Sequence, residues 1–525
     1  MKCRFTFPKS HAFAARLLVL LGLVAGSCFP ASGQATAPAD FTPAPLHPDA
    51  NPIRSCESLN QLTIANVAID SAGIEPTDGS CRVTATVVPQ PGGGRIRVWI
   101  GLPVKGWNGR FRGTGGGGFL GGGPRTLLRP IAAGYVAGAT DTGHEGGSGS
   151  FALDAKGRLD WPAIQNNAYR GIHEMTVLGK AVTTAFYGKP PKYSYFEGSS
   201  TGGRQGLMEA QRYPEDYDGI VSACPAINWH RFVPVDLWPQ VVMSAAGRFL
   251  PKSKFDVATA AAVKACDPLD GVSDGVIDDP SACDFDPKGL VGTQVDGDPF
   301  TAVDADVIRQ IWNGPKRQDG TFLWYGLSRG TDLAALAGTG GNPLTGKPFG
   351  VALDWFRFFL VQDPAWDWTK LTPVAFEARW VQSVEQYGSI IGTDQDDLSA
   401  FRDRKGKVII YHGLADQLIP AEGSIQYYDR LRRKMGPDTD RFARLFLAPG
   451  VDHGFRGAGP TPVGLTAAIT RWVEQDEAPD QLLAELRDKD GRVLRTRPLF
   501  PYPKFARFGG RGSTDEASSF HAVSR

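Results

Sequence analysis

The sequence predicts an α/β fold whose sheet is interrupted by a large insertion, and three observations lead to this prediction. A strand-like segment at 193–197 runs into a serine flanked by glycines, and a helix-like segment follows at 206–212. Two later apolar runs, 407–413 and 444–448, each predict a strand that ends in a polar loop. The stretch between these groups, 229–399, is rich in aromatic residues and holds an acidic loop. Together they favour an α/β-hydrolase fold with an inserted lid domain that carries a calcium loop.

The first of these elements contains a candidate nucleophile, Ser200. The residues Gly198-Ser199-Ser200-Thr201-Gly202 fit the pattern G-x-S-x-G. In the corresponding structural motif, a sharp strand-to-helix turn lifts a serine Oγ out of the backbone. A chain with 64 glycines can match this pattern by chance, and the alternative is a glycine-rich surface turn. The strand before it and the helix after it favour the nucleophile.

A nucleophilic serine needs a base and an acid, and in this fold they follow it in the order acid, histidine. Asp416 lies just beyond the strand 407–413, where parallel sheets place their chemistry. His453 lies in the loop after the strand 444–448 and would take the Ser200 proton. Turn-capping or loop roles are the alternatives for both residues. We expect Asp452 to cap its own loop and His412 to be a packed residue.

An oxyanion hole would combine the Thr201 N–H with an N–H from an early glycine-rich loop. The run Gly113-Thr114-Gly115-Gly116-Gly117-Gly118 is the candidate. We favour Gly117 as the donor, with the residue on either side as the alternative. The run has no Gly-Lys-Ser/Thr ending, which excludes a phosphate-binding loop of the P-loop type.

The acidic loop at 266–280 has the composition of a cation site. Asp267, Asp270 and Asp274 are separated by glycines and small residues. Hard cations such as Ca²⁺ prefer several oxygen ligands, and the spacing differs from that of an EF-hand. A solvated acidic turn is the alternative, but close carboxylates repel each other unless a cation neutralises them. We therefore expect one structural calcium ion as the cofactor.

Composition and cysteine usage predict a secreted or periplasmic protein. The 525 residues carry a net charge of +1, which gives no reason to expect nucleic acid or an anionic membrane as a partner. A basic start and an apolar core at 17–24 predict a signal peptide, and lipidation at Cys28 is the less favoured alternative. No later run has transmembrane length. The predicted segments are a signal peptide at 1–33, a linker at 34–50, the catalytic domain at 51–228 and 400–525, and the lid at 229–399.

Four of the seven cysteines are expected to form two disulfides. Cys266 and Cys283 bracket the acidic loop, and Cys56 and Cys81 lie near the start of the catalytic domain. Cys224 is then left over, and we interpret it as a small buried apolar residue rather than a nucleophile. The glycine- and serine-rich residues after about Arg507 are expected to lie loosely on the surface.

These motifs together resemble the tannase/feruloyl esterase family of serine esterases, which includes bacterial mono-(2-hydroxyethyl) terephthalate hydrolases. The resemblance is carried by the elbow with its Gly203-Arg204-Gln205 continuation, by the Asp416 and His453 loops, and by the segments 107–118, 141–144, 169–176 and 497–503. It implies hydrolysis of small aromatic esters of feruloyl, galloyl or terephthaloyl type through an acyl-enzyme. It also implies that the Val272 and Val276 carbonyls complete the calcium site. A serine peptidase or amidase with the same triad, and a non-catalytic phenolic- or carbohydrate-binding protein, are the alternatives.

The sequence departs from the family pattern next to the candidate site. Relatives carry a disulfide between a cysteine before the nucleophile and one after the histidine, whereas Ser199 and Gly454 stand here. We expect these two residues to lie close together, with Cα atoms about 4.4–6.8 Å apart as in a disulfide. A C-terminal cysteine pair of the relatives is replaced by Phe500 and His521.

Overall fold

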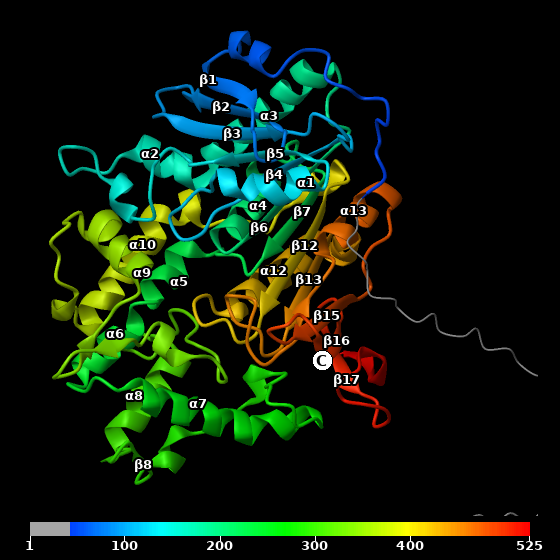
Figure 1. The fold of residues 1–525 in the computed structure, drawn as a ribbon. Helices are drawn as coiled ribbons and strands as arrows, with labels where there is room; N and C mark the ends of the chain where they lie inside the picture. The colour runs from blue at the N-terminus through cyan, green and yellow to red at the C-terminus, as the bar shows by residue number, and fades with distance from the viewer. Residues whose placement is uncertain (1–42, 525) are drawn as a thin grey trace, which may run out of the picture. The chain divides into compact units, whose positions relative to one another are not determined.

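A computed structural model describes residues 43–524. Its centre is a mixed nine-stranded sheet with the order β1-β2-β3-β5-β4-β6-β7-β12-β13 (Figure 1). β1, β2, β3 and β5 pair antiparallel, and β5 onward pair parallel. The predicted signal peptide and Cys28 lie outside the described residues. The strands are β1 (Val67–Ile74), β2 (Cys81–Val87), β3 (Ile96–Leu102), β4 (Arg110–Thr114), β5 (Val136–Thr140), β6 (Tyr193–Ser199), β7 (Gly219–Ala223), β12 (Lys407–Gly413) and β13 (Ala443–Ala448).

Helices cover both faces of this sheet, so its central strands are buried on two sides and read as continuous apolar runs. On one face, α3 (Gly171–Tyr187), α4 (Thr201–Arg212) and α12 (Ala421–Met435) share a hydrophobic core with the sheet. On the other face, α13 (Leu465–Gln475) packs through Ile469 and Trp472. The short helices α1 (Leu128–Ala132), α2 (Trp161–Gln165) and α11 (Ser399–Asp403) complete the sheet-bearing part.

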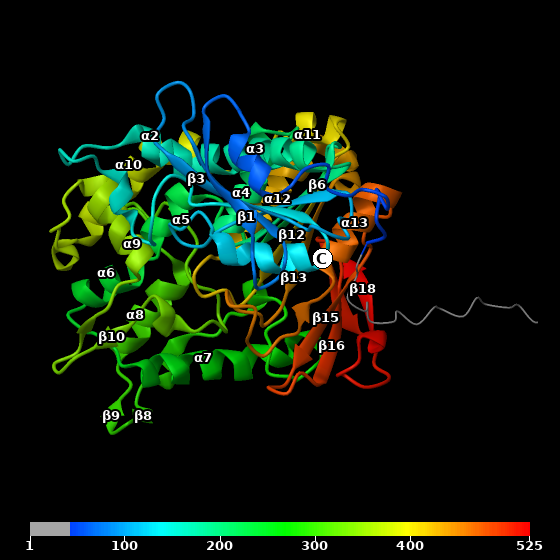
Figure 2. The same ribbon diagram turned by 45° about the horizontal axis from the view of Figure 1, so that its top comes forward.

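The segment between β7 and α11 is mostly helical and lies to one side of the sheet (Figures 1 and 2). It has a large aromatic core in which Trp355, Phe356 and Phe359 are almost fully buried. This core continues into the sheet-bearing part through Phe119 and Ile419. The segment comprises α5 (Trp229–Val235), α6 (Trp238–Ala245), α7 (Lys252–Cys266), β8 (Gln294–Val295), β9 (Asp298–Pro299), α8 (Ala302–Asn313), β10 (Thr339–Gly340), β11 (Thr345–Gly346), α9 (Gly350–Asp354) and α10 (Pro373–Ile391).

The structure contains both expected disulfides, Cys56–Cys81 and Cys266–Cys283. Cys224 is buried and free, as expected. Among the described residues, no helix is long and apolar enough to cross a membrane.

The expectation of a loose C-terminal tail is wrong. β14 (Thr461–Pro462), β15 (Leu482–Arg487) and β16 (Val493–Leu499) form a small sheet, and β17 (Lys504–Phe508) pairs with β18 (Phe520–Ser524). Phe520 is only 9% exposed, and the Arg497 guanidinium lies 3.9 Å from the centre of its ring. Hydrogen bonds join the tail to β16 as well, since the Thr496 N–H donates to the Asp515 carbonyl and the Ala517 N–H to the Thr496 Oγ1, both at 2.8 Å. A glycine- and serine-rich composition gives no sign of these contacts.

Candidate active site

Ser200 occupies a strained turn between β6 and α4. Its φ of 59° and ψ of −124° are unusual for a residue with a side chain, and such strain concentrates at functional sites. The turn is tight enough that a Cβ on Gly198 would lie 2.5 Å from the Gly202 carbonyl carbon. A Cβ on Gly203 would come equally close, 2.5 Å, to the Ala223 carbonyl oxygen. The glycines around Ser200 are therefore required by close backbone approach.

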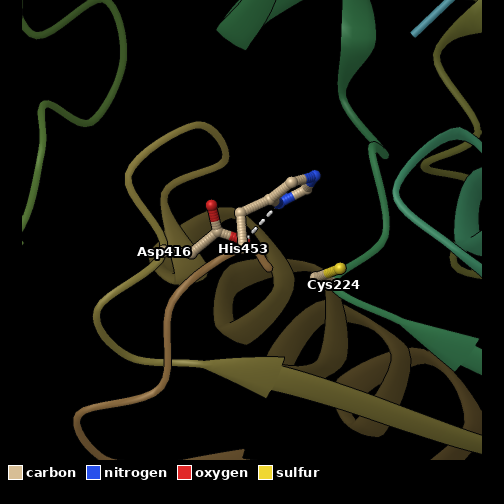
Figure 3. A group of neighbouring side chains, drawn as sticks. All are labelled: Cys224, Asp416 and His453. Atoms are coloured by element: carbon tan, nitrogen blue, oxygen red, sulfur yellow. Dashed lines mark hydrogen bonds and ion pairs between the residues drawn. The ribbon is translucent and has the colours of Figure 1, made fainter. Parts of the chain in front are cut away.

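Hydrogen bonds connect Ser200 to His453 and His453 to Asp416. Along the sequence, the first two residues are 253 positions apart and the last two are 37 positions apart. The His453 Nε2 lies 3.0 Å from the Ser200 Oγ, and its Nδ1 lies 2.8 Å from the Asp416 Oδ2. Figure 3 shows the second of these contacts. The geometry requires Nδ1 to donate to the carboxylate, which leaves the Nε2 lone pair facing the serine hydroxyl.

Asp416 is held in place by several donors. Its Oδ1 accepts the backbone N–H groups of Leu418, at 2.9 Å, and Ile419, at 2.8 Å. The Nε2 of His412 lies 3.2 Å from its Oδ2. Burial alone would raise the pKa of Asp416, but the hydrogen bonds from His412 and His453 outweigh it and hold the pKa well below its usual range. Asp416 is therefore ionised at any working pH.

The structure places Asp452 and His412 as the sequence predicts. The Asp452 Oδ1 accepts the N–H groups of Gly454, at 2.8 Å, and Arg456, at 2.7 Å, so this aspartate caps its own loop. His412 is fully buried, and its Nδ1 lies 2.8 Å from the Ser424 Oγ. It is thus a packed residue that also orients Asp416.

Burial would lower the pKa of His453, but its hydrogen bonds to Asp416 and to Cys224 raise the pKa above the usual 6.5. Burial also raises the pKa of the Cys224 thiol, which is therefore neutral near neutral pH. Asp416 is accordingly the partner that stabilises the imidazolium. A base of this kind can accept a proton and hold it during the lifetime of an intermediate.

Cys224 is a neighbour of the site that the sequence did not reveal. It follows β7 with a φ of 32°, and its Sγ lies close to His453 and Asp416 (Figure 3). Asp236, at the end of α5, is a second unforeseen neighbour. It is 2% exposed. Its pKa is raised far above the usual value, mainly by burial and to a smaller extent by the negative charge of Asp416. A carboxyl group from the insertion is thus held neutral within range of the Asp416 charge.

The glycine-rich loop lies directly against the elbow. The Gly202 N–H donates to the Gly116 carbonyl at 3.0 Å, and the Gly116 N–H donates to the Gln205 Oε1 at 3.0 Å. The Gly116 N–H is therefore already used. A Cβ on Gly117 would meet nothing within 4 Å, so this residue borders open space. Thr201 begins α4, whose first N–H groups have no partner within the helix.

The insertion reaches this loop. A Cβ on Gly118 would lie 3.4 Å from the Val351 Cγ2 of α9. On the other side, a cleft separates the insertion from the acid and histidine loops. It is lined by Val263, Ile277 and Arg329 of the insertion and by Ala415, Gln417 and Asp452 of the sheet-bearing part.

The acidic loop has features that fit a hard cation. The Asp267 carboxylate accepts the N–H groups of Asp274, Gly275 and Val276 at 3.0, 3.1 and 3.3 Å, which closes the loop. Arg495 and Arg497 both bind the Oδ2 of Asp274, leaving its Oδ1 available. 

Asp278 also belongs to this cluster and was not foreseen. Burial, then the charge of Asp270 and a hydrogen bond with it, raise the pKa of Asp278 far above the usual value. Two carboxylates in such contact need a proton or a cation between them, so the donor set is compatible with calcium.

A serine on a strained strand-to-helix turn, with an imidazole and a buried carboxylate aligned behind it, is the arrangement that defines the α/β serine hydrolases as a class. Comparison with known proteins narrows this class. Residues 81–523 match the model of a family described as "Tannase and feruloyl esterase". A probable feruloyl esterase of Arthroderma benhamiae is 38% identical over 474 residues, covering 87% of this chain and 86% of that protein. An uncharacterized esterase of Xanthomonas campestris is 31% identical, covering 89% of this chain and 91% of its own length.

Structures of related proteins agree with this match. The crystal structure of feruloyl esterase B from Aspergillus oryzae is 27% identical and superposes with a TM-score of 0.79, covering 89% of this chain and 99% of that one. A tannin acyl hydrolase from Aspergillus niger has a TM-score of 0.79 at 24% identity, which shows a common fold. The chain therefore belongs to the tannase and feruloyl esterase family of carboxylic ester hydrolases.

Proposed function

We propose that this protein is a secreted esterase that cleaves esters of aromatic acids of the feruloyl, galloyl or terephthaloyl type through an acyl-enzyme. The observation that carries the proposal is the continuous chain from the Ser200 Oγ through His453 to Asp416, with contacts of 3.0 and 2.8 Å. The named relatives, a probable feruloyl esterase and feruloyl esterase B, support phenolic acid esters as the substrate class.

In the proposed mechanism, the Ser200 Oγ attacks the ester carbonyl carbon while the His453 Nε2 takes the hydroxyl proton. The imidazolium, stabilised by Asp416, then gives this proton to the departing alcohol oxygen, and the acyl group remains on Ser200. A water molecule attacks the acyl-enzyme with His453 again as the base. This second step releases the aromatic acid and restores the serine.

The oxyanion of each tetrahedral intermediate would be bound by the N–H groups of Thr201 and Gly117. The Gly116 N–H donates to Gln205, and this contact supports its neighbour Gly117 as the second donor. Gln205 would act as a support, because its Nε2 also donates to the Gly121 carbonyl at 3.2 Å and thus ties the loop to α4. A single donor of this kind is worth roughly 10²–10³ in kcat.

One calcium ion would hold the acidic loop, bound by the side chains of Asp267, Asp270 and Asp274 and the carbonyls of Val272 and Val276. When bound, the ion would supply charge neutralisation rather than reaction chemistry. A structural role is supported by the adjacent Cys266–Cys283 disulfide and by the contacts of Asp274 with Arg495 and Arg497, which connect the loop to β16.

Secretion is supported by the two disulfides, since disulfides are typical of oxidising compartments. The signal peptide itself stays a prediction from the sequence.

A hydrolysis screen tests the proposed function. The enzyme and its Ser200→Ala variant are assayed on methyl ferulate, methyl gallate, chlorogenate, mono-(2-hydroxyethyl) terephthalate and a peptide p-nitroanilide. We expect turnover of at least one aromatic ester by the wild type, loss of that turnover in the variant, and no cleavage of the anilide. Cleavage of the anilide without any ester turnover would instead identify an amidase.

A further inference from the structure

Cys224 is fixed beside the proposed catalytic base by its backbone. Its φ of 32° is rare for a non-glycine residue, and its N–H donates to the Tyr411 carbonyl at 2.6 Å, which connects it to β12. The residue is 2% exposed. A side chain at a strained and buried position has few alternative placements, so the thiol is held next to His453.

The thiol, the imidazole and a carboxylate oxygen form a set of metal ligands. Cys224, His453 and Asp416 each offer one ligand atom, and these atoms lie within 4.8 Å of one another. Sulfur, nitrogen and oxygen ligands at about 2.0–2.3 Å in a tetrahedral zinc site are about 3.4 Å apart. Shifts of roughly 1 Å or less would therefore bring the three atoms to coordination distance of one ion.

We propose that Cys224, His453 and Asp416 bind a thiophilic divalent cation of the zinc class and that this binding inhibits the enzyme. The inhibition rests on the proposed role of His453 as the base. Coordination through Nε2 would occupy the lone pair that accepts the Ser200 proton. Coordination through Nδ1 would leave the remaining ring proton on Nε2, with the same result.

The binding step involves no oxidant or reductant. The Cys224 thiol releases its proton to solvent and binds as thiolate, and an imidazolium at His453 likewise releases one ring proton to solvent and binds as neutral imidazole. Asp416 already binds as a carboxylate. Two negative ligands balance the two positive charges of the cation. The His453 side chain is 15% exposed, so the ion can reach the site from solvent at this residue.

The structure supplies a matched control. A second group, His173, Glu209 and Asp216, also places three ligand atoms within 4.8 Å of one another, and His173 contacts Asp216 at 2.7 Å. This group lies on α3 and around the end of α4, whereas Cys224, Asp416 and His453 lie in the loops after β7, β12 and β13. A His173→Ala variant therefore removes the alternative zinc site and leaves the proposed one.

The first experiment measures ester hydrolysis by the full chain against added Zn²⁺, with excess Ca²⁺ present so that the acidic loop does not take up zinc. The wild type and His173→Ala should be inhibited at the same zinc concentration. In Cys224→Ala and Cys224→Ser the concentration for half-inhibition should rise at least about tenfold, since even the loss of an outer partner has this effect on metal affinity. An unchanged value in both Cys224 variants, or a loss of inhibition in His173→Ala, would overturn the proposal.

The second experiment detects the metal without activity. Cd²⁺ is added to the wild type, to Ser200→Ala and to Cys224→Ala, and the ultraviolet thiolate-to-metal charge-transfer band is recorded. The band should form in the first two proteins and be missing in the third. Its absence in the wild type would refute the metal site. A band in a protein that hydrolyses none of the tested esters would instead keep the site and reject the proposed function.

Discussion

Replacing Asp416 with asparagine should abolish most catalysis without unfolding the protein. The asparagine could keep its oxygen toward His453 only by rotating its amide group by 180°, and the structure shows why this rotation is unfavourable. The Asp416 Oδ1 accepts two backbone N–H groups, from Leu418 and Ile419. An asparagine must keep its oxygen at that position, because its NH₂ cannot accept these bonds. The NH₂ group then faces the His453 Nδ1 and acts as a donor toward it.

This orientation reverses the tautomer of His453. With Nδ1 as the acceptor, the ring proton moves to Nε2, which lies 3.0 Å from the Ser200 Oγ and can no longer take the serine proton. The equivalent change in a Ser-His-Asp enzyme lowers kcat by about 10⁴. At 1.36 kcal/mol per factor of ten, this corresponds to about 5.4 kcal/mol of lost transition-state stabilisation.

The assay compares kcat and kcat/KM of the wild type, Asp416→Asn and the control Asp452→Asn on one aromatic ester, with a thermal melt of each protein. In the wild type, kcat/KM should rise with pH through a group above 6.5, since only neutral His453 acts as a base and Asp416 raises its pKa. In Asp416→Asn the residual activity should also rise with pH, but the rise should occur at a lower pH, because the neutral asparagine no longer raises the pKa of His453. If Asp416→Asn keeps more than about a tenth of wild-type kcat while Asp452→Asn is severe, then Asp452 is the acid and our assignment is wrong.

Three further predictions concern the base, the cation and the missing disulfide. Ser200→Ala and His453→Ala should each lower kcat by several orders of magnitude. The kcat of the double variant should be only slightly lower than that of either single variant, because the two residues act as a unit. A kcat loss in the double variant equal to the product of the two single losses would contradict this prediction. Removal of calcium by EDTA, or Asp270→Ala, should lower the melting temperature and leave KM nearly unchanged, because an ion at a hundredfold excess over Kd adds about 2.7 kcal/mol to the free energy of unfolding; an unchanged melting curve would argue against the site. Introducing Ser199→Cys and Gly454→Cys together should form a disulfide worth ~2–4 kcal/mol, whereas either cysteine alone should give no gain; a Cα separation above about 7 Å would exclude the bridge.

Local sequence patterns were sufficient for the elements that carry the candidate site. The strand predicted at 407–413 is β12 (Lys407–Gly413), and the one at 444–448 agrees with β13 (Ala443–Ala448) within one residue. Such strands are recognisable because central parallel strands are buried on both faces and are therefore apolar along their length. The elbow is recognisable because the tight turn leaves no room for side chains beside Ser200, so glycines occupy the flanking positions in the sequence.

The sequence predicted only part of the acidic cluster in the loop at 266–280. The spacing of Asp267, Asp270 and Asp274 indicated a cation site, but Asp278 joins the cluster only because burial brings its carboxyl group against Asp270. In the same way, composition suggested a loose tail, whereas the burial of Phe520 under Arg497 anchors it. A pairwise contact of this kind leaves no periodic signal.

The sequence by itself determined the fold class, the elbow at Ser200 and the candidates for acid and base, since each depends on residues that are neighbours along the chain. The sequence also favoured Asp416 over Asp452, but only the tertiary structure shows that Asp416 contacts His453 while Asp452 caps its own loop. The tertiary structure also placed two further residues near the site: Cys224, which the sequence analysis interprets only as a small buried residue, and Asp236, which no sequence pattern indicated. The physical reason is that parallel strands far apart in sequence end at one edge of the sheet, and the pairing order of β6, β7, β12 and β13 decides which loops meet there.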